Sequence, residues 1–567
     1  MKKMQCRKVF GGLMAGVLLA MSLAACGSPD DGGTPSSAGN SESGGSRSES
    51  GGSQAEGAAM EPGPLGKYGE EITLTTVRTL DSTVKFEPGN PDRASLEENI
   101  WQRSYKEELG INLEYLWTPN TEQYEQKWNA AMATQDLPDF AVVGPAIYKE
   151  LVEADLVMDM TDIFDQYASD LYRQYVEAED GLAVNFMTFG GRMYGLPHTG
   201  TTADNITVMF IRRDWLEKVE RDVPKTMEEL RDTVKAFQDA KLGGEDTVGI
   251  SLSNTLLAGI HTTNGLFEGY GAYYDTWVED GSGGLAYGTI RPEMREALLG
   301  LQQMYKDGMF RQDFATIDGT KAGEDVASGK CGIVFGTFWA PLNSVNDSIM
   351  ADEKADWIVC DIPTVDGSPY KSVATGSPAQ YIFVNKNCEH PEAVVKLLNL
   401  NCEIKASGDR KHEVDEDGFE AFKYKVACDM SEAYYNLKSY YVVKEALDSG
   451  DTSKIPSDMQ SCYDDVVKGL EGDRSMLGYA LVFGPGGTYE KVGELRDAGR
   501  IVQSAYTTFQ TDTMLEKSAD LNQNLAAAIQ KVILGADISV FDEAVETWKS
   551  TGGDTITQEV NDWYKAQ

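Results

Sequence analysis

INLEYLWTPNTEQYEQKWNAAMATQDLPDFAVV, residues 111–143, is a stretch whose pattern predicts a strand, a helix and a second strand in succession. Apolar and polar residues alternate over 111–115, which is the period of a strand with one buried face. Tyr124, Trp128 and Met132 then recur at every fourth position, which predicts a helix with one apolar face. The stretch ends in LPDFAVV, a short apolar run that is typical of a buried strand.

The same alternation continues towards the N-terminus. Residues 72–77, ITLTTV, predict a strand, and Ser95 to Glu98 have the pattern of a capping box at the start of a helix. Strands that alternate with helices indicate an α/β fold with a largely parallel sheet. Because ligands of such sheets bind at the carboxyl ends of the strands, we expect the functional residues in loops that follow strands.

The N-terminus carries an apolar run that ends in a cysteine. Basic residues between 2 and 8 precede the mostly apolar residues 9–25, a run that is short for a membrane span. LAAC at 23–26 has the pattern of a lipobox, in which the chain is cleaved before the cysteine and the cysteine is acylated. An ordinary signal peptide that is followed by a cysteine is the alternative. We therefore expect a lipoprotein signal peptide over 1–25 and a lipid on Cys26.

Residues 26–66 predict a disordered tether between this anchor and a folded body. From 27 to 64 the chain is mostly Gly, Ser, Glu, Ala and Pro, and Thr34 is its single β-branched residue. Such a composition buries too little apolar surface to offset the entropy lost on folding. No later apolar run approaches a membrane span in length, so we expect the body to stand outside the membrane.

The charge and the motif content argue against several function classes. The chain has 90 acidic and 50 basic residues, a net charge of −40 that repels the phosphate backbone of nucleic acids. It contains no HExxH and no GxSxG motif, and its four histidines fit no catalytic pattern. We expect a protein that is not an enzyme and that uses no cofactor.

Six cysteines remain beyond Cys26, and none of them forms a CxxC pair. One or two disulfides and scattered buried thiols are both compatible with their spacing. They stand at Cys331, Cys360, Cys388, Cys402, Cys428 and Cys462.

Seven segments stand in a familiar order: ATQDLPDFAVV (133–143), GGRMYGLPHTG (190–200), FIRRDWLEKVERDVPKTMEEL (210–230), YGTIRPEMREALLGLQQMYKDG (287–308), ASGKCGIVFGTFWAP (327–341), YIFVNKNCEHPEAVVKLLNL (381–400) and VFDEAVETWKSTGGDTITQEVNDWYK (540–565). Together they resemble the family 1 extracellular solute-binding proteins. More narrowly, they resemble the lipoproteins that serve carbohydrate-importing ABC transporters in Gram-positive bacteria. The resemblance covers nearly all of the chain beyond the tether.

The resemblance implies a two-lobed fold of the type II periplasmic-binding-protein-like class, with a cleft between the lobes and hinge strands that cross between them. The crossings would lie near 198–208 and 370–382. Lobe one would hold 67–200 and about 375–505, and lobe two would hold 201–374 and about 506–567.

One segment departs from the family pattern. Many relatives carry a calcium loop before a DTxGI segment, and here that place is FQDAKLGGEDTVGI, 237–250. Calcium requires six to eight oxygen ligands. Asp239 and Glu245 alone do not supply them, so we expect no metal there.

A sugar has an apolar face and a rim of hydroxyls, so its site needs aromatic platforms and convergent polar groups. Trp339 is the first candidate, because it follows an apolar strand and because relatives place a stacking aromatic at Phe338 or Trp339. Packing in the core of the lobe is the alternative for Trp339, and also for two other tryptophans among the further candidates. These candidates are Trp277, Trp117, Tyr148, Gly144, Arg78, Asp81, Asp204 and Asn205.

The sequence thus predicts a monomeric, lipid-anchored receptor on the outside of a Gram-positive cell. It would bind an oligosaccharide between its lobes and deliver it to an ABC transporter permease. A receptor for a peptide or another solute and an extracellular polysaccharide hydrolase are the alternatives. The sequence does not identify the sugar, its length or its linkage.

Overall fold

The computed structural model describes residues 61–80, 84–178, 182–199, 202–257, 259–374, 380–415, 419–426, 432 and 434–567. The predicted signal peptide, Cys26 and the tether up to 60 lie outside the described residues, as do Asp81 and Cys428. Within the described part of the chain, no helix combines the length and apolar character that crossing a membrane requires.

One hydrophobic core takes its buried side chains from residues 68–196 and 381–426, and we call it the first core. β1 and β2 pair in parallel, whereas β3 pairs antiparallel with β12. The elements of this region are β1 (Ile72–Val77), α1 (Ile100–Ser104), β2 (Ile111–Trp117), α2 (Thr121–Thr134), β3 (Phe140–Val143), α3 (Pro145–Glu153), α4 (Thr161–Tyr167), α5 (Asp170–Glu177), α6 (Leu182–Asn185), β4 (Thr188–Phe189), β5 (Arg192–Met193), β12 (Tyr381–Val384) and α13 (Pro391–Ser407).

The strand, helix and strand predicted over 111–143 are confirmed as β2, α2 and β3. Trp128, in the predicted apolar stripe of α2, is fully buried in the first core. The Asn120 side chain caps this helix by accepting a hydrogen bond from the N–H of Gln123 at 3.0 Å. Local pattern was therefore sufficient for this part of the fold.

The predicted capping box at Ser95 is wrong. α1 begins five residues later, and its N-cap is Asn99, whose side chain accepts from the N–H of Gln102. The Ser95 hydroxyl accepts hydrogen bonds from the N–H groups of Glu97 and Glu98, so it closes a turn before the helix. Serine satisfies free N–H groups in a turn as readily as at a helix start.

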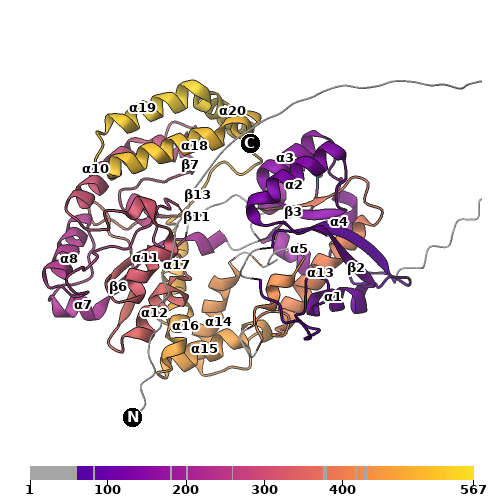
Figure 1. Ribbon diagram of the computed structural model, residues 1–567, viewed down its shortest axis with the longest axis horizontal. Coiled ribbons are helices and arrows are strands. Elements are labelled where there is room, and N and C mark those ends of the chain that lie inside the picture. The colour runs from indigo at the N-terminus through magenta and orange to yellow at the C-terminus, as the bar shows by residue number, and fades with distance from the viewer. Residues whose placement is uncertain are drawn as a thin grey trace, which may run out of the picture. The chain divides into compact units, whose positions relative to one another are not determined.

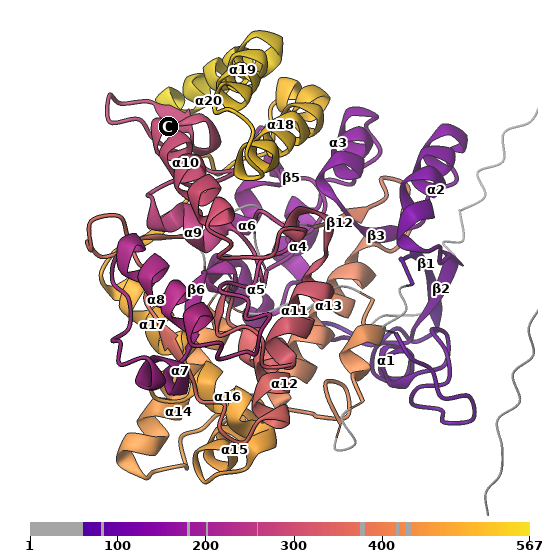
Figure 2. The same ribbon diagram turned by 60° about the vertical axis from the view of Figure 1, so that its left-hand side comes forward.

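A second core takes its buried side chains from 206–374 and 437–560. Its sheet has β6 between β10 and β9, both antiparallel to it, and α18 packs against α10 and α19 (Figures 1 and 2). The strands of this region are β6 (Val208–Arg212), β7 (Trp277–Glu279), β8 (Leu285–Tyr287), β9 (Ile333–Gly336), β10 (Trp357–Cys360), β11 (Ser372–Ala374) and β13 (Ile501–Gln503). Its helices are α7 (Arg213–Lys218), α8 (Met227–Asp239), α9 (Asn264–Gly269), α10 (Pro292–Lys306), α11 (Gly319–Ala327), α12 (Ser344–Ala351), α14 (Tyr435–Ser449), α15 (Gln460–Leu470), α16 (Leu477–Phe483), α17 (Thr488–Asp497), α18 (Asp512–Ile533), α19 (Ser539–Trp548) and α20 (Asp554–Ala566).

The expectation of a largely parallel sheet is wrong for the described strands. Only the pairs β1–β2 and β11–β13 are parallel, and the other strand pairs are antiparallel. β12 joins β3 only after the chain has passed through the second core. A strand that returns from another part of the molecule is not constrained to the parallel direction that a local strand–helix–strand connection imposes.

The lobe boundaries expected from the sequence stay a prediction, and the two cores differ from them over one segment. Buried residues between Leu437 and Leu495 belong to the second core, whereas the prediction placed about 375–505 in lobe one. The helix α16 packs against α12, and in Figure 1 α14 to α17 lie away from β2 and β3. The helix α13, in contrast, packs in the first core.

The chain passes between the two cores at several places. Core membership changes between Leu196 and Ile206, and again between Ala374 and Tyr381. We call these two passages the first crossing, of which 197–199 and 202–205 are described, and the second crossing, of which 380 is described. Phe509 makes a further connection, because it follows β13 and its ring lies 5.7 Å from that of Tyr148 in the first core.

Five of the six predicted mature cysteines are described, and all five are free thiols. Burial raises the pKa of each of them to about 12, so they stay protonated at neutral pH. For these residues the buried-thiol alternative is the one that the structure shows. They are Cys331, Cys360, Cys388, Cys402 and Cys462.

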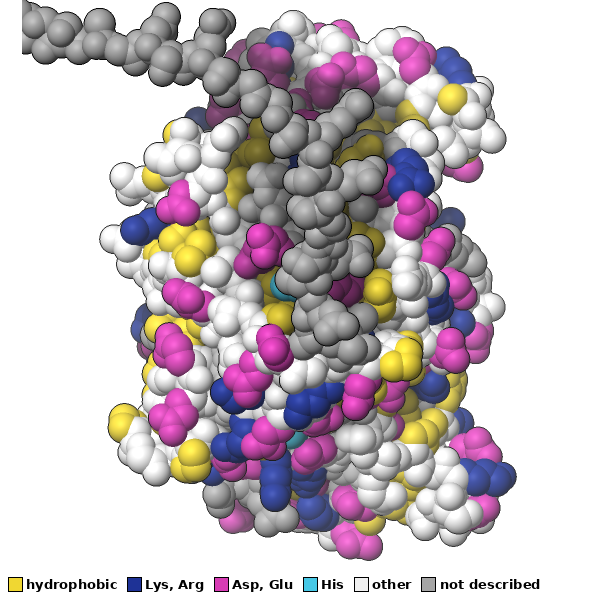
Figure 3. Space-filling model, turned by 90° about the vertical axis from the view of Figure 1, so that its right-hand side faces the viewer, with side chains coloured by type: hydrophobic (Ala, Val, Ile, Leu, Met, Phe, Trp, Pro, Cys, Tyr) yellow, Lys and Arg dark blue, Asp and Glu magenta, His cyan; other side chains and the backbone are white. Residues whose placement is uncertain are grey.

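Acidic side chains are spread over the face of the molecule in Figure 3, and Lys and Arg gather mainly in its lower half. Many of the charges are paired. Arg212, at the end of β6, is buried and donates to Asp214 at 2.6 Å and to Asp352 at 3.1 Å. A buried arginine needs such partners, and this one fixes the start of α7 to the loop before β10.

Candidate functional site

Phe338 and Trp339 follow Thr337 after the carboxyl end of β9 and precede a short turn of 3-10 helix at Ala340–Leu342. The Trp339 side chain is 40% exposed, which is unusual for an indole. It lies beside the loop at Gly259, where an added Cβ would come within 4.0 Å of its Cζ2 atom. Trp339 therefore offers an aromatic surface at the end of a strand of the second core.

Phe338 belongs to a cluster that also contains Asp204, Tyr489 and Asn436, and we call it the Asp204 cluster. The rings of Phe338 and Tyr489 have centroids 5.4 Å apart. The Tyr489 hydroxyl donates to one carboxylate oxygen of Asp204, and the Asn436 amide donates to the other at 2.8 Å. Burial and the Asp204 charge raise the pKa of Tyr489 well above its usual value, so the phenol stays a donor.

The Asp204 cluster joins four separate parts of the chain. Asp204 and Asn205 form a 3-10 turn at Thr202–Asn205 in the first crossing, and Phe338 follows β9. Tyr489 and Asn436 come from α17 and α14. Sequence reasoning missed these last two residues, because they lie in the segment 401–505, which matches none of the seven motifs.

Gly144 and Tyr148 lie at the start of α3, after β3. The Tyr148 ring is fully buried and stacks on Tyr381 with centroids 4.5 Å apart. Its hydroxyl donates to the carbonyl of Tyr194, and burial raises its pKa well above the usual value. Tyr148 is therefore a residue of the first core. Gly144 is half-buried, and an added Cβ would meet no atom within 4 Å, so its backbone is approachable.

Trp117 is the last residue of β2, Arg78 follows β1, and both are half-buried. Trp117 meets Tyr124 and Trp128 edge-to-face, with centroids 5.9 and 5.6 Å away. The Arg78 guanidinium donates to the carbonyl of Lys423 at 2.9 Å and to that of Lys425 at 3.3 Å. Arg78 thus ties β1 to the segment after α13.

Trp277, at the start of β7, lies in the second core and is 7% exposed. Its ring is 5.3 Å from that of Tyr287, which in turn stacks on Trp548. In this structure it offers a ligand almost no surface. Trp277 was a candidate because it stands in a loop rich in Tyr and Gly. That position in the sequence does not separate a core tryptophan from one that lines a cleft.

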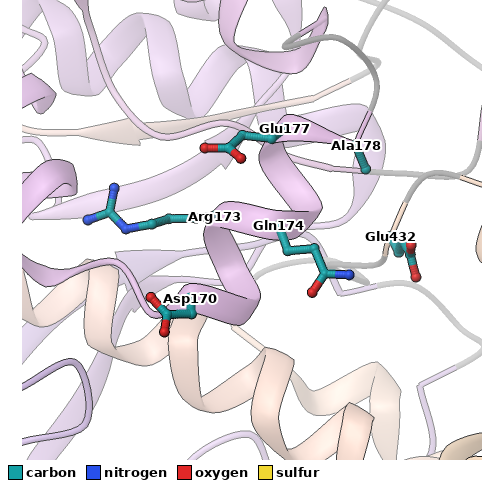
Figure 4. Close-up of a pocket in the computed structure, with 6 residues that line it drawn as sticks. All are labelled: Asp170, Arg173, Gln174, Glu177, Ala178 and Glu432. Carbon is teal, nitrogen blue, oxygen red and sulfur yellow. The ribbon is translucent and has the colours of Figure 1, made fainter.

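A cavity of about 590 Å³ lies beside α5 and is lined by Asp170, Arg173, Gln174, Glu177, Ala178 and Glu432 (Figure 4). Arg173 and Glu177 point to one side of α5 in this view, and Gln174 points to the side of Glu432. Arg173 donates to the carbonyl of Phe164 at 3.0 Å, and Glu432 pairs with Lys438 at 2.6 Å. The described lining residues are mostly polar, and none of them carries an aromatic ring on which a sugar could stack.

Two of the three acidic residues in the segment 237–250 form ion pairs with lysines. Asp239 pairs with Lys235 at 3.2 Å, and Glu245 pairs with Lys241 at 2.6 Å. Among the described residues, no group of three or more His, Cys, Asp and Glu side chains is arranged to hold a metal ion. The expectation that no calcium binds here stays a prediction.

Two histidines make contacts that resemble a catalytic arrangement. His412 lies 2.9 Å from the Ser104 hydroxyl through Nε2 and 2.9 Å from the Asp409 carboxylate through Nδ1, and both His412 and Ser104 are buried. His261 is the other. Its Nδ1 lies 2.8 Å from the Ser251 hydroxyl, and its Nε2 lies 3.1 Å from the Ser344 hydroxyl. All three side chains are buried, and burial lowers the pKa of His261 to about 4. A neutral histidine with both nitrogens bonded to buried serines holds the loop before α9 against α12 and has no access to a substrate.

Comparison with known proteins agrees with this architecture. The family model for bacterial extracellular solute-binding proteins matches residues 88–400, which is more than half of the chain. Lipoprotein LipO of Bacillus subtilis is 24% identical over 467 residues, which cover 81% of this chain and 87% of LipO. The polygalacturonan/rhamnogalacturonan-binding protein YtcQ of Bacillus subtilis is 24% identical over 464 residues, which cover 80% of this chain and 85% of YtcQ.

Among solved structures, the substrate-binding protein FusA of Streptococcus pneumoniae in complex with kestose has a TM-score of 0.60. It is 15% identical, and the match covers 87% of this chain and 100% of that chain. At this identity the likeness shows the fold alone. The chain has the two-lobed α/β fold of type II periplasmic-binding-protein-like solute-binding proteins, as the sequence predicted.

Proposed function

The chain belongs to the family of bacterial extracellular solute-binding proteins, and on this premise we propose that it captures an oligosaccharide between its lobes and delivers it to an ABC transporter permease. The exposed ring of Trp339 is the observation that supports a sugar as the ligand. Its indole is 40% exposed at the carboxyl end of β9, and the preceding residue, Phe338, contacts Tyr489 of the Asp204 cluster.

An aromatic ring beside polar groups suits the two surfaces of a sugar. The C–H face of a pyranose or furanose ring stacks on the indole, and hydroxyls bond to nearby polar atoms. Both oxygens of Asp204 already accept hydrogen bonds from Tyr489 and Asn436, so this carboxylate orients its neighbours. Contacts that only the closed form makes to both lobes then shift the population towards closure.

Two relatives support a carbohydrate ligand. YtcQ is described as binding polygalacturonan and rhamnogalacturonan, and FusA was solved with kestose. One of these ligand classes is acidic and the other is neutral, so the two relatives leave the charge of the sugar open. A peptide receptor of the same fold is the alternative, and the screen described below separates the two.

The anchor is part of the proposal. The LAAC sequence at 23–26 supports acylation of Cys26, and a diacyl or triacyl anchor holds a protein at a membrane stably. Metabolic labelling with an alkyne fatty acid should mark the wild-type chain, and Cys26→Ala should lose the label and leave the membrane fraction. A wild-type chain that takes up no label would contradict the anchor.

The binding function is tested by a glycan array and a peptide library probed with the chain from residue 27 onward, followed by calorimetric titration of each hit. We expect binding of an oligosaccharide, with the sugar recovered unchanged by mass spectrometry after prolonged incubation. Binding of peptides only would favour the alternative receptor, and shortened glycan products would favour the hydrolase.

A further inference from the structure

Glu268 is a carboxylate that is 1% exposed, in the middle of the second core at α9. Its two oxygens accept hydrogen bonds from the Ser372 hydroxyl at 3.0 and 2.9 Å. One of them also accepts from the N–H of Val373 at 2.8 Å and from the Asn264 amide at 2.9 Å. These donors offset the cost of burying a carboxylate, because an unpaired buried carboxylate would destabilise the fold strongly.

The donors around Glu268 connect two separate segments. The N–H of Thr207 donates to the Ser372 hydroxyl at 3.1 Å, and the second Asn264 amide proton goes to the Thr207 hydroxyl at 3.2 Å. Thr207 is the residue before β6, where the first crossing enters the second core. Ser372 and Val373 belong to β11, from which the second crossing leaves it.

A third segment is attached to the same point. β11 pairs in parallel with β13, with Ser372 opposite Ile501 and Ala374 opposite Gln503. The chain after β13 reaches the first core at Phe509. Glu268 thus contacts β11 directly, Thr207 through one further hydrogen bond, and β13 through the pairing of β13 with β11. These are the three segments that lead towards the first core.

The other ionisable groups near Glu268 do not neutralise it. Burial is the main cause that raises the pKa of Tyr273, after α9, and of Tyr370, before β11, and the Glu268 charge raises both further. Arg500, before β13, lies over the Tyr370 ring at 5.8 Å and donates to the Tyr370 carbonyl. No ion pair with Glu268 occurs in the described part of the chain, and burial raises its pKa to about 8 against the effect of its donors.

We propose that Glu268 is a positioning residue for solute capture: it fastens the crossing segments to the second core and so sets the pivot about which the lobes close. This inference rests on the proposed function, because closure is the motion that captures the solute. Hinges of this kind are a few residues at element ends, and a fixed pivot confines the motion to one axis.

The test measures the distance between the lobes without any sugar. Spin labels are placed on exposed positions of α3 and α19 with Glu150→Cys and Glu543→Cys, in the chain from residue 27 onward. The background carries Cys462→Ser, because Cys462 is half-buried, and Cys428→Ser, because Cys428 lies outside the described residues. Pulsed electron resonance then gives the distribution of distances. We expect Glu268→Ala to broaden this distribution, and Glu268→Gln to keep it close to wild type, because the amide oxygen still accepts from Val373 and Asn264.

Asp325→Ala is the matched control, since Asp325 is also a buried carboxylate of lobe two but pairs with Arg311 at 3.1 Å, away from the crossings. It should reduce the unfolding temperature and leave the distribution unchanged. A wild-type distribution in Glu268→Ala, or equal broadening in Asp325→Ala, overturns the proposal. If Glu268→Ala does not fold, Ser372→Ala gives the same decision, because it removes the link to Thr207. Failure to bind oligosaccharides would leave these distances unaffected, so the two proposals fail separately.

Discussion

Trp339 and Tyr148 hold similar places in the sequence pattern, a few residues after a buried strand, and the structure treats them differently. β3 continues almost at once into α3, and Tyr148 lies one turn into that helix with its ring stacked on Tyr381. β9 is followed by a turn, and Trp339 lies before the next short helix with 40% of its side chain exposed. The difference teaches that a helix carries an aromatic back onto the core, whereas a turn leaves it outside.

Tyr148→Ala should have the largest effect on stability among the variants proposed here. Loss of a fully buried aromatic ring that is stacked on Tyr381 should lower the free energy of unfolding by about 3–5 kcal/mol. Urea unfolding followed by fluorescence measures it. Tyr148→Phe is the control and should lose only about 1 kcal/mol, for the hydrogen bond to the Tyr194 carbonyl. Near-wild-type stability of Tyr148→Ala would mean that the ring is not a core residue.

Glu268, in the second core, should make the stability of the protein depend on pH. Its pKa is raised from 4.5 to about 8, so the folded protein binds a proton that the unfolded chain releases between these values. The contribution of Glu268 to the free energy of unfolding is therefore fully present below pH 4.5. It is lost as the pH rises through 8, by up to about 1.4 kcal/mol per pH unit. Glu268→Gln does not titrate, so wild type should lose stability relative to it between pH 5 and 9. Parallel curves for the two proteins would contradict this prediction.

Trp339→Ala tests the exposed aromatic of this pair, and it should affect binding more than stability. It should weaken binding of the oligosaccharide found in the screen by about 1–3 kcal/mol, the value of one aromatic face buried by a ligand. Its unfolding free energy should change by less than about 0.5 kcal/mol. Calorimetric titration and urea unfolding of the same variant give both numbers.

Leu342→Ala is the control for this pair of measurements, because Leu342 is exposed on the same short turn. It should change neither binding nor stability. If Trp339→Ala unfolds easily and its folded fraction binds normally, Trp339 is a core residue and Phe338 becomes the candidate platform.

Removal of metal should give the smallest effect of all. Asp239 and Glu245 pair with lysines in the segment where relatives carry a calcium loop. A strong chelator should therefore leave the unfolding temperature of the protein unchanged, as measured by scanning calorimetry. A drop that added calcium reverses would show that the segment binds the ion.

The parts of the fold that were predictable are those set by neighbours in the chain. Trp128 lies on the buried face of α2 because helical periodicity alone places it there. The antiparallel pairing of β3 with β12 was not predictable, since it joins strands from distant segments and no local pattern records a partner. For the same reason the packing of Leu437 to Leu495 in the second core could not be read from a segment without a motif.

The candidate site divides in the same way. Trp339 could be found from its place after an apolar strand, and Asp204 from its place in a crossing. Tyr489 and Asn436, which bond to Asp204, could not, because they are distant in the chain and carry no distinctive spacing. Trp277 was a reasonable candidate that the structure places in a core.

The sequence by itself determined the elements of local pattern: the strand, helix and strand of 111–143, and the two-lobed class through seven ordered motifs. Only the tertiary structure decided which aromatics face solvent, which strands pair and where the crossing segments are fastened. The physical reason is that periodicity and capping depend on interactions within a few residues. The burial of Tyr148 and the hydrogen bonds of Glu268 depend on groups that only the folded chain brings together.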